Sequence, residues 1–300
     1  MKKVCFSVAM SVYQKDNPDQ LDVALNSICT QSYLPSEVYL VIDGPIGSDL
    51  SSVIDKYASS YDFFTIKQLE KNGGLGNALR IAVENCKYDL IARMDSDDIS
   101  APGRFRKQVE AFISDPVDVQ GGWTLGFFGD LYKGDVSAFT PKLTNEEIHK
   151  QIAIRTPISH VTAFFRREAV LAAGNYKDLF YHEDYYLWAR MISLGMTFRN
   201  IPEYLVYVRC GENASARHGG IKYFQAESFL RSFILEKGLS SKKDYYTQML
   251  KRIIYELLLP PKARVYIDKK YKRHFLSRVE VDDILARNKE TDYIPIVDKG

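Results

Sequence analysis

The chain has 300 residues, of which 46% are hydrophobic and 26% are charged, an ordinary composition for a globular protein with a sizeable core. Its formal net charge of +2 argues against a dedicated nucleic-acid binder. The sequence contains no run of about 18 apolar residues, so we expect no membrane span. Four cysteines stand far apart without a C-x-x-C pair, which is typical of reduced thiols in a cytoplasmic protein.

Short apolar runs alternate with segments of helical spacing through the first hundred residues. The runs that predict strands cover 4–13, 37–42, 63–69 and 88–94, and the segments that predict helices cover 19–31, 50–59 and 76–86. This alternation predicts a parallel sheet with helices on both faces. Ligands of such sheets bind beyond the carboxyl ends of the strands, so we expect three polar strand exits to meet at one cleft. These exits are Tyr13-Gln14-Lys15, Asp43-Gly44 and Asp95-Ser96-Asp97-Asp98.

The pattern changes after Pro102. We predict helices over 104–114, 167–173 and 183–193, a strand-like segment over 158–165 and a last strand pair over 198–208. A Gly- and aromatic-rich stretch over 121–129 and the residues 158–163 are expected to supply irregular loops around the ligand. From 223 to 258, apolar residues recur at intervals of three and four, which predicts an amphipathic helix pair that ends at Pro260-Pro261.

The segment from Lys262 to Arg278 carries seven Lys or Arg residues and only Asp268 as an acid. Two interpretations of this region and the preceding helix pair remain open. The helices would pack against the rest of the chain, or they would contact an anionic membrane surface together with the basic segment.

The tetrad Asp95-Ser96-Asp97-Asp98 places three carboxylates within four residues, where a predicted strand gives way to a loop. Oxygen ligands suit Mg²⁺ or Mn²⁺, and these ions keep open positions for phosphate. The pattern therefore predicts a divalent cation held against a diphosphate. A solvated acidic turn or a helix cap is the alternative, because Asp and Ser are common at both.

Gly73, Gly74 and Gly76 lie between a predicted strand and a predicted helix, where backbone amides could approach an anion. Their spacing does not match G-x-G-x-x-G, and no acidic residue follows at the distance that a dinucleotide-binding fingerprint requires. We interpret the cluster as a tight turn beside a nucleotide.

Six motifs, in order between residue 4 and about residue 210, closely resemble those of family-2 glycosyltransferases. They are Phe6-Ser7-Val8-Ala9-Met10-Ser11-Val12-Tyr13, Val41-Ile42-Asp43-Gly44, Asn72-Gly73-Gly74-Leu75-Gly76, Arg93-Met94-Asp95-Ser96-Asp97-Asp98, Pro157-Ile158-Ser159-His160 and His182-Glu183-Asp184-Tyr185-Tyr186-Leu187-Trp188. Within that family, Gly121-Gly122-Trp123 and the C-terminal helices make the chain most similar to bacterial polysaccharide enzymes of the amylovoran-biosynthesis type.

The resemblance implies an α/β protein of the GT-A fold, with a mostly parallel, Rossmann-like nucleotide-binding sheet flanked by helices and a C-terminal helical extension. The implied glycosyltransferase domain covers 1–220, with a nucleotide-binding half over 1–103 and an acceptor-binding half over 104–220. The extension covers 221–300 and is the part that would associate with a membrane.

Donor and metal contacts are also implied by the resemblance. Asp95 and Asp97 would be the D-x-D pair, with Asp97 on the metal, Asp95 shared between metal and ribose, and Ser96 beside the donor. Asp98 would orient the loop or cap the next helix. Four further donor contacts are implied: the carboxylate of Asp43 on the uracil or ribose edge, the tight turn at Gly74, and backbone at Val12 and Tyr13 lining the base pocket. A plain turn before Gly44-Pro45 is the alternative for Asp43.

For the acceptor side, the resemblance makes Asp184 the general base and Glu183 its support. An acidic pair at a helix N-terminus, favoured by the helix dipole, is the alternative. His160 and Trp188 are candidate acceptor contacts. Arg217, in a Gly/Asn/Ser-rich stretch, could close over the diphosphate as part of a lid.

Taken together, the motifs imply an inverting glycosyltransferase that depends on Mn²⁺ or Mg²⁺ and moves a hexose from a nucleotide sugar, most simply a UDP-hexose. The acceptor would be a polysaccharide or an undecaprenyl-diphosphate-linked glycan, in O-antigen, capsule or exopolysaccharide biosynthesis at the cytoplasmic face of the inner membrane. Two alternatives stay open. A sugar-phosphate nucleotidyltransferase would share the sheet and metal site but need no base such as Asp184, and a non-catalytic nucleotide-sugar-binding module would keep the pocket without turnover.

Overall fold

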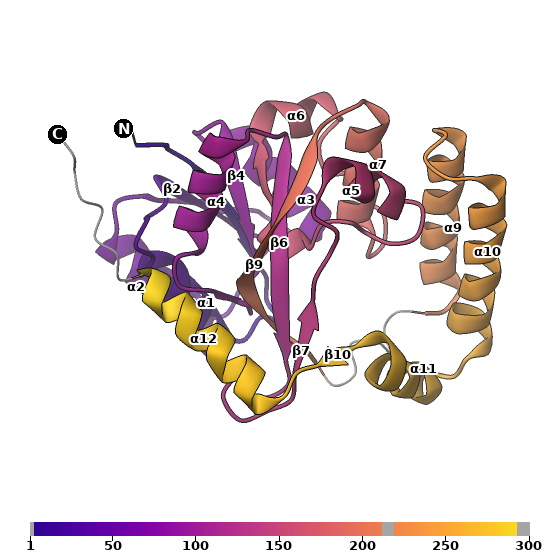
Figure 1. Cartoon of the computed structure of the whole chain (residues 1–300). Helices are drawn as coiled ribbons and strands as arrows, with labels where there is room; N and C mark the ends of the chain where they lie inside the picture. Colours follow the sequence, from indigo (N-terminus) through magenta and orange to yellow (C-terminus); the bar gives the residue numbers. More distant parts are fainter. Residues whose placement is uncertain (1–2, 212–218, 293–300) are drawn as a thin grey trace.

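The computed structural model describes residues 3–211 and 219–292 (Figure 1). Within these ranges, ten strands form one sheet. Eight of them follow the order β10-β7-β6-β8-β4-β1-β2-β3, while β9 pairs with β6 and β5 pairs with β9. The chain is thus an α/β protein with a central sheet between helices, as predicted, and its C-terminal region is helical.

The first half of the sheet is parallel, and its boundaries lie close to the predicted ones. Its strands are β1 (Ser7–Val12), β2 (Glu37–Ile42), β3 (Phe64–Gln68) and β4 (Leu90–Met94), and its helices are α1 (Pro18–Cys29), α2 (Ser48–Ser60) and α3 (Leu75–Asn85). Successive side chains of β1 and β2 alternate between two apolar cores, because neighbouring residues of a strand point to opposite faces. Helices α1 and α2 cover one face and α3 covers the other.

The second half mixes parallel and antiparallel pairs. Its strands are β5 (Ile99–Ser100), β6 (Val119–Phe127), β7 (Val136–Phe139), β8 (Phe164–Arg166) and β9 (Phe198–Arg209), and its helices are α4 (Arg104–Ser114), α5 (Asn145–Gln151), the short 3-10 turn η1 (His160–Thr162), α6 (Arg167–Ala172) and α7 (Glu183–Ser193). Strands β4 and β8 pair antiparallel, so β8 joins the two halves of the sheet.

Three sequence predictions in this half are wrong. Residues 121–127 of the expected loop lie inside β6, because β6 pairs along its whole length with β9. A Cβ at Gly122 would lie 2.4 Å from a carbon of Leu205, so glycine permits this close strand packing. The expected strand pair over 198–208 is one strand, with register shifts on either side of Trp123 where Pro202 interrupts the ladder. Residues 160–162, expected in a strand, form η1 instead.

The C-terminal region begins beside α7 and ends back on the sheet (Figure 1). Its elements are α9 (Ile221–Glu236), α10 (Lys242–Arg252), the π-helical η2 (Ile253–Leu258), α11 (Pro261–Ile267), η3 (Asp268–Lys272), β10 (His274–Phe275) and α12 (Arg278–Asp292). The helix that starts at α10 ends before Pro260-Pro261, as expected. Leu230 and Ile234 of α9 enter the core around α7, and β10 pairs with β7.

Helix α12 adds three apolar side chains to a third core under β6 and β9; they are Val281, Ile284 and Leu285. The division of the chain at residue 220 stays a prediction. Across 3–211 and 219–292, no helix is both long enough and apolar enough to cross a bilayer.

A buried arginine ties α4 to the end of β4. The Arg104 side chain is fully buried, and its Nη2 donates to the backbone oxygens of Arg93 at 2.8 Å and Val161 at 2.9 Å. Its Nε donates to Gln108 at 3.0 Å, and Gln108 donates in turn to the Thr162 carbonyl at 2.8 Å. These bonds hold the strand end that precedes the acidic tetrad against η1.

We expect Arg104→Met to lower the free energy of unfolding by about 2–4 kcal/mol, because two buried carbonyls would lose their donor. Urea denaturation followed by circular dichroism measures this. Glu110→Gln, on the exposed face of α4, is the control and should change the stability by less than about 0.5 kcal/mol. Equal stability of the two variants would contradict the role assigned to Arg104.

Candidate active site

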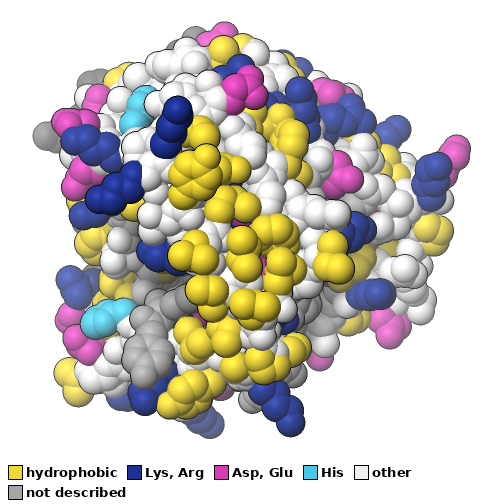
Figure 2. Space-filling model, turned by 90° about the vertical axis from the view of Figure 1, so that its right-hand side faces the viewer, with side chains coloured by type: hydrophobic (Ala, Val, Ile, Leu, Met, Phe, Trp, Pro, Cys, Tyr) yellow, Lys and Arg dark blue, Asp and Glu magenta, His cyan; other side chains and the backbone are white. Residues whose placement is uncertain are grey.

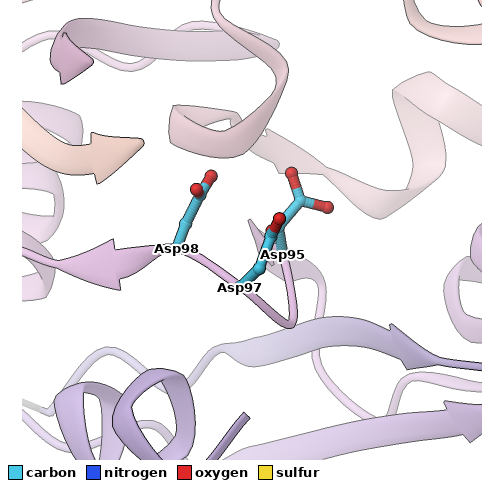
Figure 3. A group of neighbouring side chains, drawn as sticks. All are labelled: Asp95, Asp97 and Asp98. Carbon is cyan, nitrogen blue, oxygen red and sulfur yellow. The ribbon is translucent and has the colours of Figure 1, made fainter. Parts of the chain in front are cut away.

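Three carboxylates gather on the loop that follows β4, the strand between β1 and β8 (Figure 3). Asp95, Asp97 and Asp98 each offer an oxygen, and these oxygens all lie within 4.8 Å of one another. Asp98 is buried and accepts the backbone N–H of Arg209 at 2.8 Å, while Arg209 Nε donates to the Asp97 carbonyl at 3.2 Å. The end of β9 therefore orients this loop. The residue that precedes α4 is Gly103, without a side-chain cap, so Asp98 does not cap that helix.

A buried cation contacts this cluster: Arg93, the fourth residue of β4. Its side chain is 3% exposed, and Nη1 pairs with a carboxylate oxygen of Asp95. Burial, reinforced by the charges of Asp95 and Asp16, raises the pKa of Asp97 to about 6. Burial and the charges of Asp95 and Asp97 raise the pKa of Asp98 well above its ordinary range. Negative charge thus exceeds what one guanidinium can offset, and the donor set fits a hard divalent cation.

Asp16 joins this group and was not predicted from the sequence. It accepts the Ser96 hydroxyl at 2.8 Å and the backbone N–H of Tyr13 at 3.1 Å. Burial is the main reason that the pKa of Asp16 is raised, against the lowering effect of these two hydrogen bonds. The only signal in the sequence was an acidic residue directly after the polar strand exit Tyr13-Gln14-Lys15. Ser96 is thereby fixed to the end of β1.

A cavity of about 390 Å³ lies at this edge of the sheet. It is lined by Ser11, Tyr13, Asp16, Asp43, Asn72, Gly74, Leu75, Asp95, Ser96 and Asp97. The three polar strand exits therefore meet, as the alternation of strands and helices predicted. Val12 is 1% exposed and is not among the residues that line the cavity, and its carbonyl accepts the backbone N–H of Asp43 at 2.8 Å. A larger cavity, of about 850 Å³, lies elsewhere, between Trp123 of β6 and α12.

The Asp43 carboxylate is held by the glycine turn. It accepts the backbone N–H groups of Gly73 at 2.7 Å and Gly74 at 2.9 Å, and the side-chain amide of Asn72 at 2.9 Å. These two amides therefore bind the carboxylate anion of Asp43, and the interpretation of the glycine cluster as a tight turn beside a nucleotide stays a prediction. Gly74 has φ +85°, a conformation that favours glycine, and it precedes the first turn of α3.

Glu183, the predicted support, and Asp184, the predicted general base, are the first two residues of α7. Both side chains are half-buried. Burial and the charge of Asp184 raise the pKa of Glu183 to about 7. Burial also raises the pKa of Asp184, but the N–H of Tyr185 and the charges of His182 and Arg93 oppose this shift. Asp184 is therefore the better stabilised carboxylate of the two.

Neither member of this pair lines the 390 Å³ cavity, but Glu183 lies beside the helix that borders it. A Cβ at Gly76 would meet Cβ of Glu183 at 3.6 Å, so Glu183 packs against the start of α3, whose Leu75 lines the cavity. Tyr176 is buried, and burial raises the pKa of its hydroxyl. The charges of Arg93, Asp184, Glu183 and Asp95 also act on this hydroxyl. Carboxylates of the acid cluster and of the Glu183-Asp184 pair therefore act on the same buried hydroxyl.

The predicted acceptor contacts fare differently. Trp188 is completely buried, and its ring packs among Phe165, Phe198 and His160, so the expectation that it touches an acceptor is wrong. The motif did not distinguish a core aromatic from a binding one. His160 is half-buried, with Nε2 at 2.8 Å from the Tyr176 hydroxyl, and burial and the charge of Arg93 place its pKa well below the ordinary value. Arg217 lies outside the described residues.

Comparisons with known proteins agree on one family. A family model described as glycosyl transferase family 2 matches residues 7–174. The chain is 36% identical to the amylovoran biosynthesis glycosyltransferase AmsE of Erwinia amylovora over 222 residues. This match covers 74% of this chain and 82% of that protein. It is 34% identical, over 275 residues, to the UDP-Gal:alpha-D-GlcNAc-diphosphoundecaprenol beta-1,3-galactosyltransferase of Escherichia coli, with 90% of this chain and 98% of that protein covered.

Solved structures show the same fold. TarS 1-349 of S. aureus in complex with UDP-GlcNAc matches with a TM-score of 0.64 at 16% identity, covering 96% of this chain and 82% of that chain. The mannosyltransferase PcManGT from Pyrobaculum calidifontis in complex with GDP-Man and Mn2+ matches with a TM-score of 0.59 at 13% identity, covering 98% and 88%. Both neighbours are glycosyltransferases of the GT-A fold.

We expect Asp97→Asn to weaken Mn²⁺ binding in the presence of UDP by at least about tenfold, because a half-buried ligand oxygen would lose its charge. Titration of Mn²⁺ followed by electron paramagnetic resonance measures the free ion. Asp49→Asn, in the exposed first turn of α2, is the matched control. Unchanged Mn²⁺ affinity in the Asp97 variant would remove this residue from the metal site.

Proposed function

The chain belongs to glycosyltransferase family 2, and from that premise we propose that it is an inverting, metal-dependent hexosyltransferase of bacterial surface polysaccharide synthesis. The observation that carries the proposal is the 390 Å³ cavity, in which Asp43 of one strand exit and the acid cluster of another lie together. A nucleotide sugar has the matching chemistry: a base and ribose with polar edges, and a diphosphate that needs neutralising.

The donor that fits best is a UDP-hexose. The E. coli relative is named for UDP-Gal, and the TarS neighbour holds UDP-GlcNAc. In this chain, the Asn72 amide and the glycine turn fix the Asp43 carboxylate, so that it presents its remaining acceptor capacity in one direction. Tyr13, at 40% exposure, offers an aromatic face to the base.

Asp97 and Asp95 would hold a divalent ion, and Asp98 completes the set from its buried position. A bound Mn²⁺ or Mg²⁺ would neutralise the charge that develops on the diphosphate leaving group. Arg93 keeps one oxygen of Asp95 engaged from below, and Ser96 is held by Asp16. These contacts fix the loop before the donor arrives, which reduces the cost of ordering it.

Asp184 would take the proton of the acceptor hydroxyl as that oxygen attacks the anomeric carbon. The bond from the anomeric carbon to the diphosphate oxygen breaks, the new glycosidic bond forms, and UDP leaves with the electron pair. Attack from the face opposite the nucleotide inverts the configuration, so an α-linked donor yields a β-linked product. The nearby charges of His182 and Arg93 favour the ionised form of Asp184 that this step needs.

The acceptor would be a lipid-diphosphate-linked glycan, because the E. coli relative is named for alpha-D-GlcNAc-diphosphoundecaprenol as its acceptor. The two other functions considered from the sequence find no specific support. A nucleotidyltransferase would have no use for the carboxylates of Glu183 and Asp184 at the start of α7. A non-catalytic binding module would have no use for these carboxylates or for the acid cluster that would hold the metal.

We expect Asp184→Asn to lower kcat by a factor of about 10²–10⁴ while UDP affinity and the fold stay unchanged, because only the proton acceptor is lost. Release of UDP from a UDP-hexose, with a synthetic lipid-diphosphate sugar as acceptor, measures turnover. Asp178→Asn, on the exposed segment before α7, is the control. Full activity of the Asp184 variant would overturn the assignment of the base.

The helix formed by α10 and η2 suggests how the enzyme reaches such an acceptor. Its outer face carries large apolar side chains at intervals of three and four, each at least 38% exposed: Tyr246, Leu250, Ile253, Ile254, Leu257 and Leu258. Figure 2 shows apolar side chains gathered on this side of the molecule, with Lys and Arg around them. Between residues 242 and 273 there are ten basic residues and three acidic ones. This combination fits an anionic lipid surface, and we propose that the face binds one.

We expect the protein to sediment with phosphatidylglycerol vesicles and not with phosphatidylcholine vesicles, and Leu250→Glu to weaken this binding by about tenfold or more. Ile113→Glu, at an exposed apolar position on α4, is the control. No binding to anionic vesicles, or equal binding of the two variants, would contradict the proposal. A dimer that Leu250→Glu dissociates would instead make a second copy of the chain the occupant of this face.

A further inference from the structure

The first turn of α7 is anchored by a charged histidine. His182 precedes Glu183, and its Nε2 lies 2.5 Å from a carboxylate oxygen of Glu227 on α9. Its Nδ1 lies 2.8 Å from the carbonyl of Phe180. The Phe180 carbonyl is an acceptor only, and Glu227 is one as well when it is ionised, as its pairing with Arg231 and Arg252 favours; with these two acceptors, both ring nitrogens carry a proton and His182 is an imidazolium.

Glu227 is a buried junction between helices. It is 2% exposed, and its other carboxylate oxygen accepts a hydrogen bond from Arg231 Nε at 2.7 Å and forms an ion pair with Arg252 Nε at 3.1 Å. Arg231 also donates to the carbonyls of Ala153 at 2.7 Å and Ile154 at 3.0 Å, on the segment after α5. A carboxylate buried in this way is stable only with its full set of partners.

The helix formed by α10 and η2 packs its polar face, and not its apolar face, against the rest of the protein around Glu227. Its inward face is polar, with Gln248 and Glu256 buried and Arg252 directed to Glu227, while its outward face is apolar. A helix that serves only to cover a core would bury its apolar face instead. The inward polar face instead contacts Glu227 through Arg252, and Glu227 contacts His182 at the start of α7.

We propose that Glu227 is a positioning residue for the general base: through its hydrogen bond to His182 it fixes the first turn of α7, and with it the placement of Glu183 and Asp184. The C-terminal helices thus complete the catalytic site from outside the nucleotide-binding half. This inference rests on the proposed function in one respect, the assignment of Asp184 as base.

The charges around His182 support this role. From α9 it faces Glu227 and the ring of Tyr223, whose centroid is 4.7 Å away, and from η2 it is near Glu256. On its own helix it is near Glu183 and Asp184. Burial alone would lower the pKa of His182, but the hydrogen bond and charge of Glu227 raise it above the ordinary value. Burial likewise would raise the pKa of Glu227, but His182, Arg231 and Arg252 lower it to about 2.

The sign of the effect follows from these contacts. If Glu227 is made neutral, His182 loses its anionic partner and gives up its proton at a lower pH. Asp184 then loses a positive neighbour, so its pKa rises and its ionised fraction falls at acidic pH. A general base must be ionised, so the acid limb of the rate profile moves to higher pH.

Glu227→Gln tests this role, since glutamine keeps the size and the acceptor oxygen but removes the charge. We expect kcat/KM to fall about tenfold at pH 6 and by less than about twofold at pH 8.5, with the KM for the UDP-hexose unchanged. Glu236→Gln, at the exposed end of the same helix, is the control and should leave the profile unchanged. A folded Glu227 variant with the wild-type pH profile would overturn the proposal.

A measurement on the unaltered protein covers the case in which Glu227→Gln does not fold. In the ¹⁵N-labelled chain, nitrogen chemical shifts report the protonation of each imidazole. We expect His182 to be doubly protonated at pH 6.5, where an ordinary histidine is about half protonated. A neutral His182 at that pH would overturn the proposal whether or not the protein transfers a hexose.

Discussion

The buried guanidinium of Arg93 is the charge on which this site depends. It lies under the loop after β4, pairs with Asp95, and acts on Asp98, Glu183 and Asp184 from within the core. Burial, together with the charges of the neighbouring acids, raises the pKa values of Asp16, Asp97 and Asp98. The carboxylates are therefore short of positive charge, and the diphosphate of the proposed donor would add to this deficit, which a divalent ion would offset.

The two ends of the chain contribute to the catalytic region in different ways. The parallel half supplies the strand exits that form the cavity, through β1, β2 and β4. The C-terminal region supplies Glu227, which holds the residue before the proposed base, and an apolar outer surface on α10 and η2. A helix with a polar inner face and an apolar outer face can serve both tasks at once. Delivery to a lipid-linked acceptor and orientation of the base would then be carried by the same element.

Much of the fold was predictable because its signals are local. The bounds predicted for β2, α4 and α7 agree with the structure to the residue, since apolar periodicity and breakers define them. The long strand β6 was missed because its glycines signal a loop locally, whereas its pairing with β9, about eighty residues later, decides its conformation. Within the site, the acids at strand exits could be found from the sequence. Asp16, the role of Arg93 and the pair of His182 with Glu227 could not, because each depends on side chains that only the folded chain brings together.

The most direct test of this account is anomalous diffraction at the manganese edge from crystals grown with UDP and Mn²⁺. The account predicts one manganese peak in the cavity, bonded to Asp97 and to the diphosphate, with the uracil toward Asp43 and the carboxylate of Asp184 facing the open side of the leaving group. UDP seated in this cavity with the manganese bound elsewhere, or UDP bound away from the acid cluster, would contradict it.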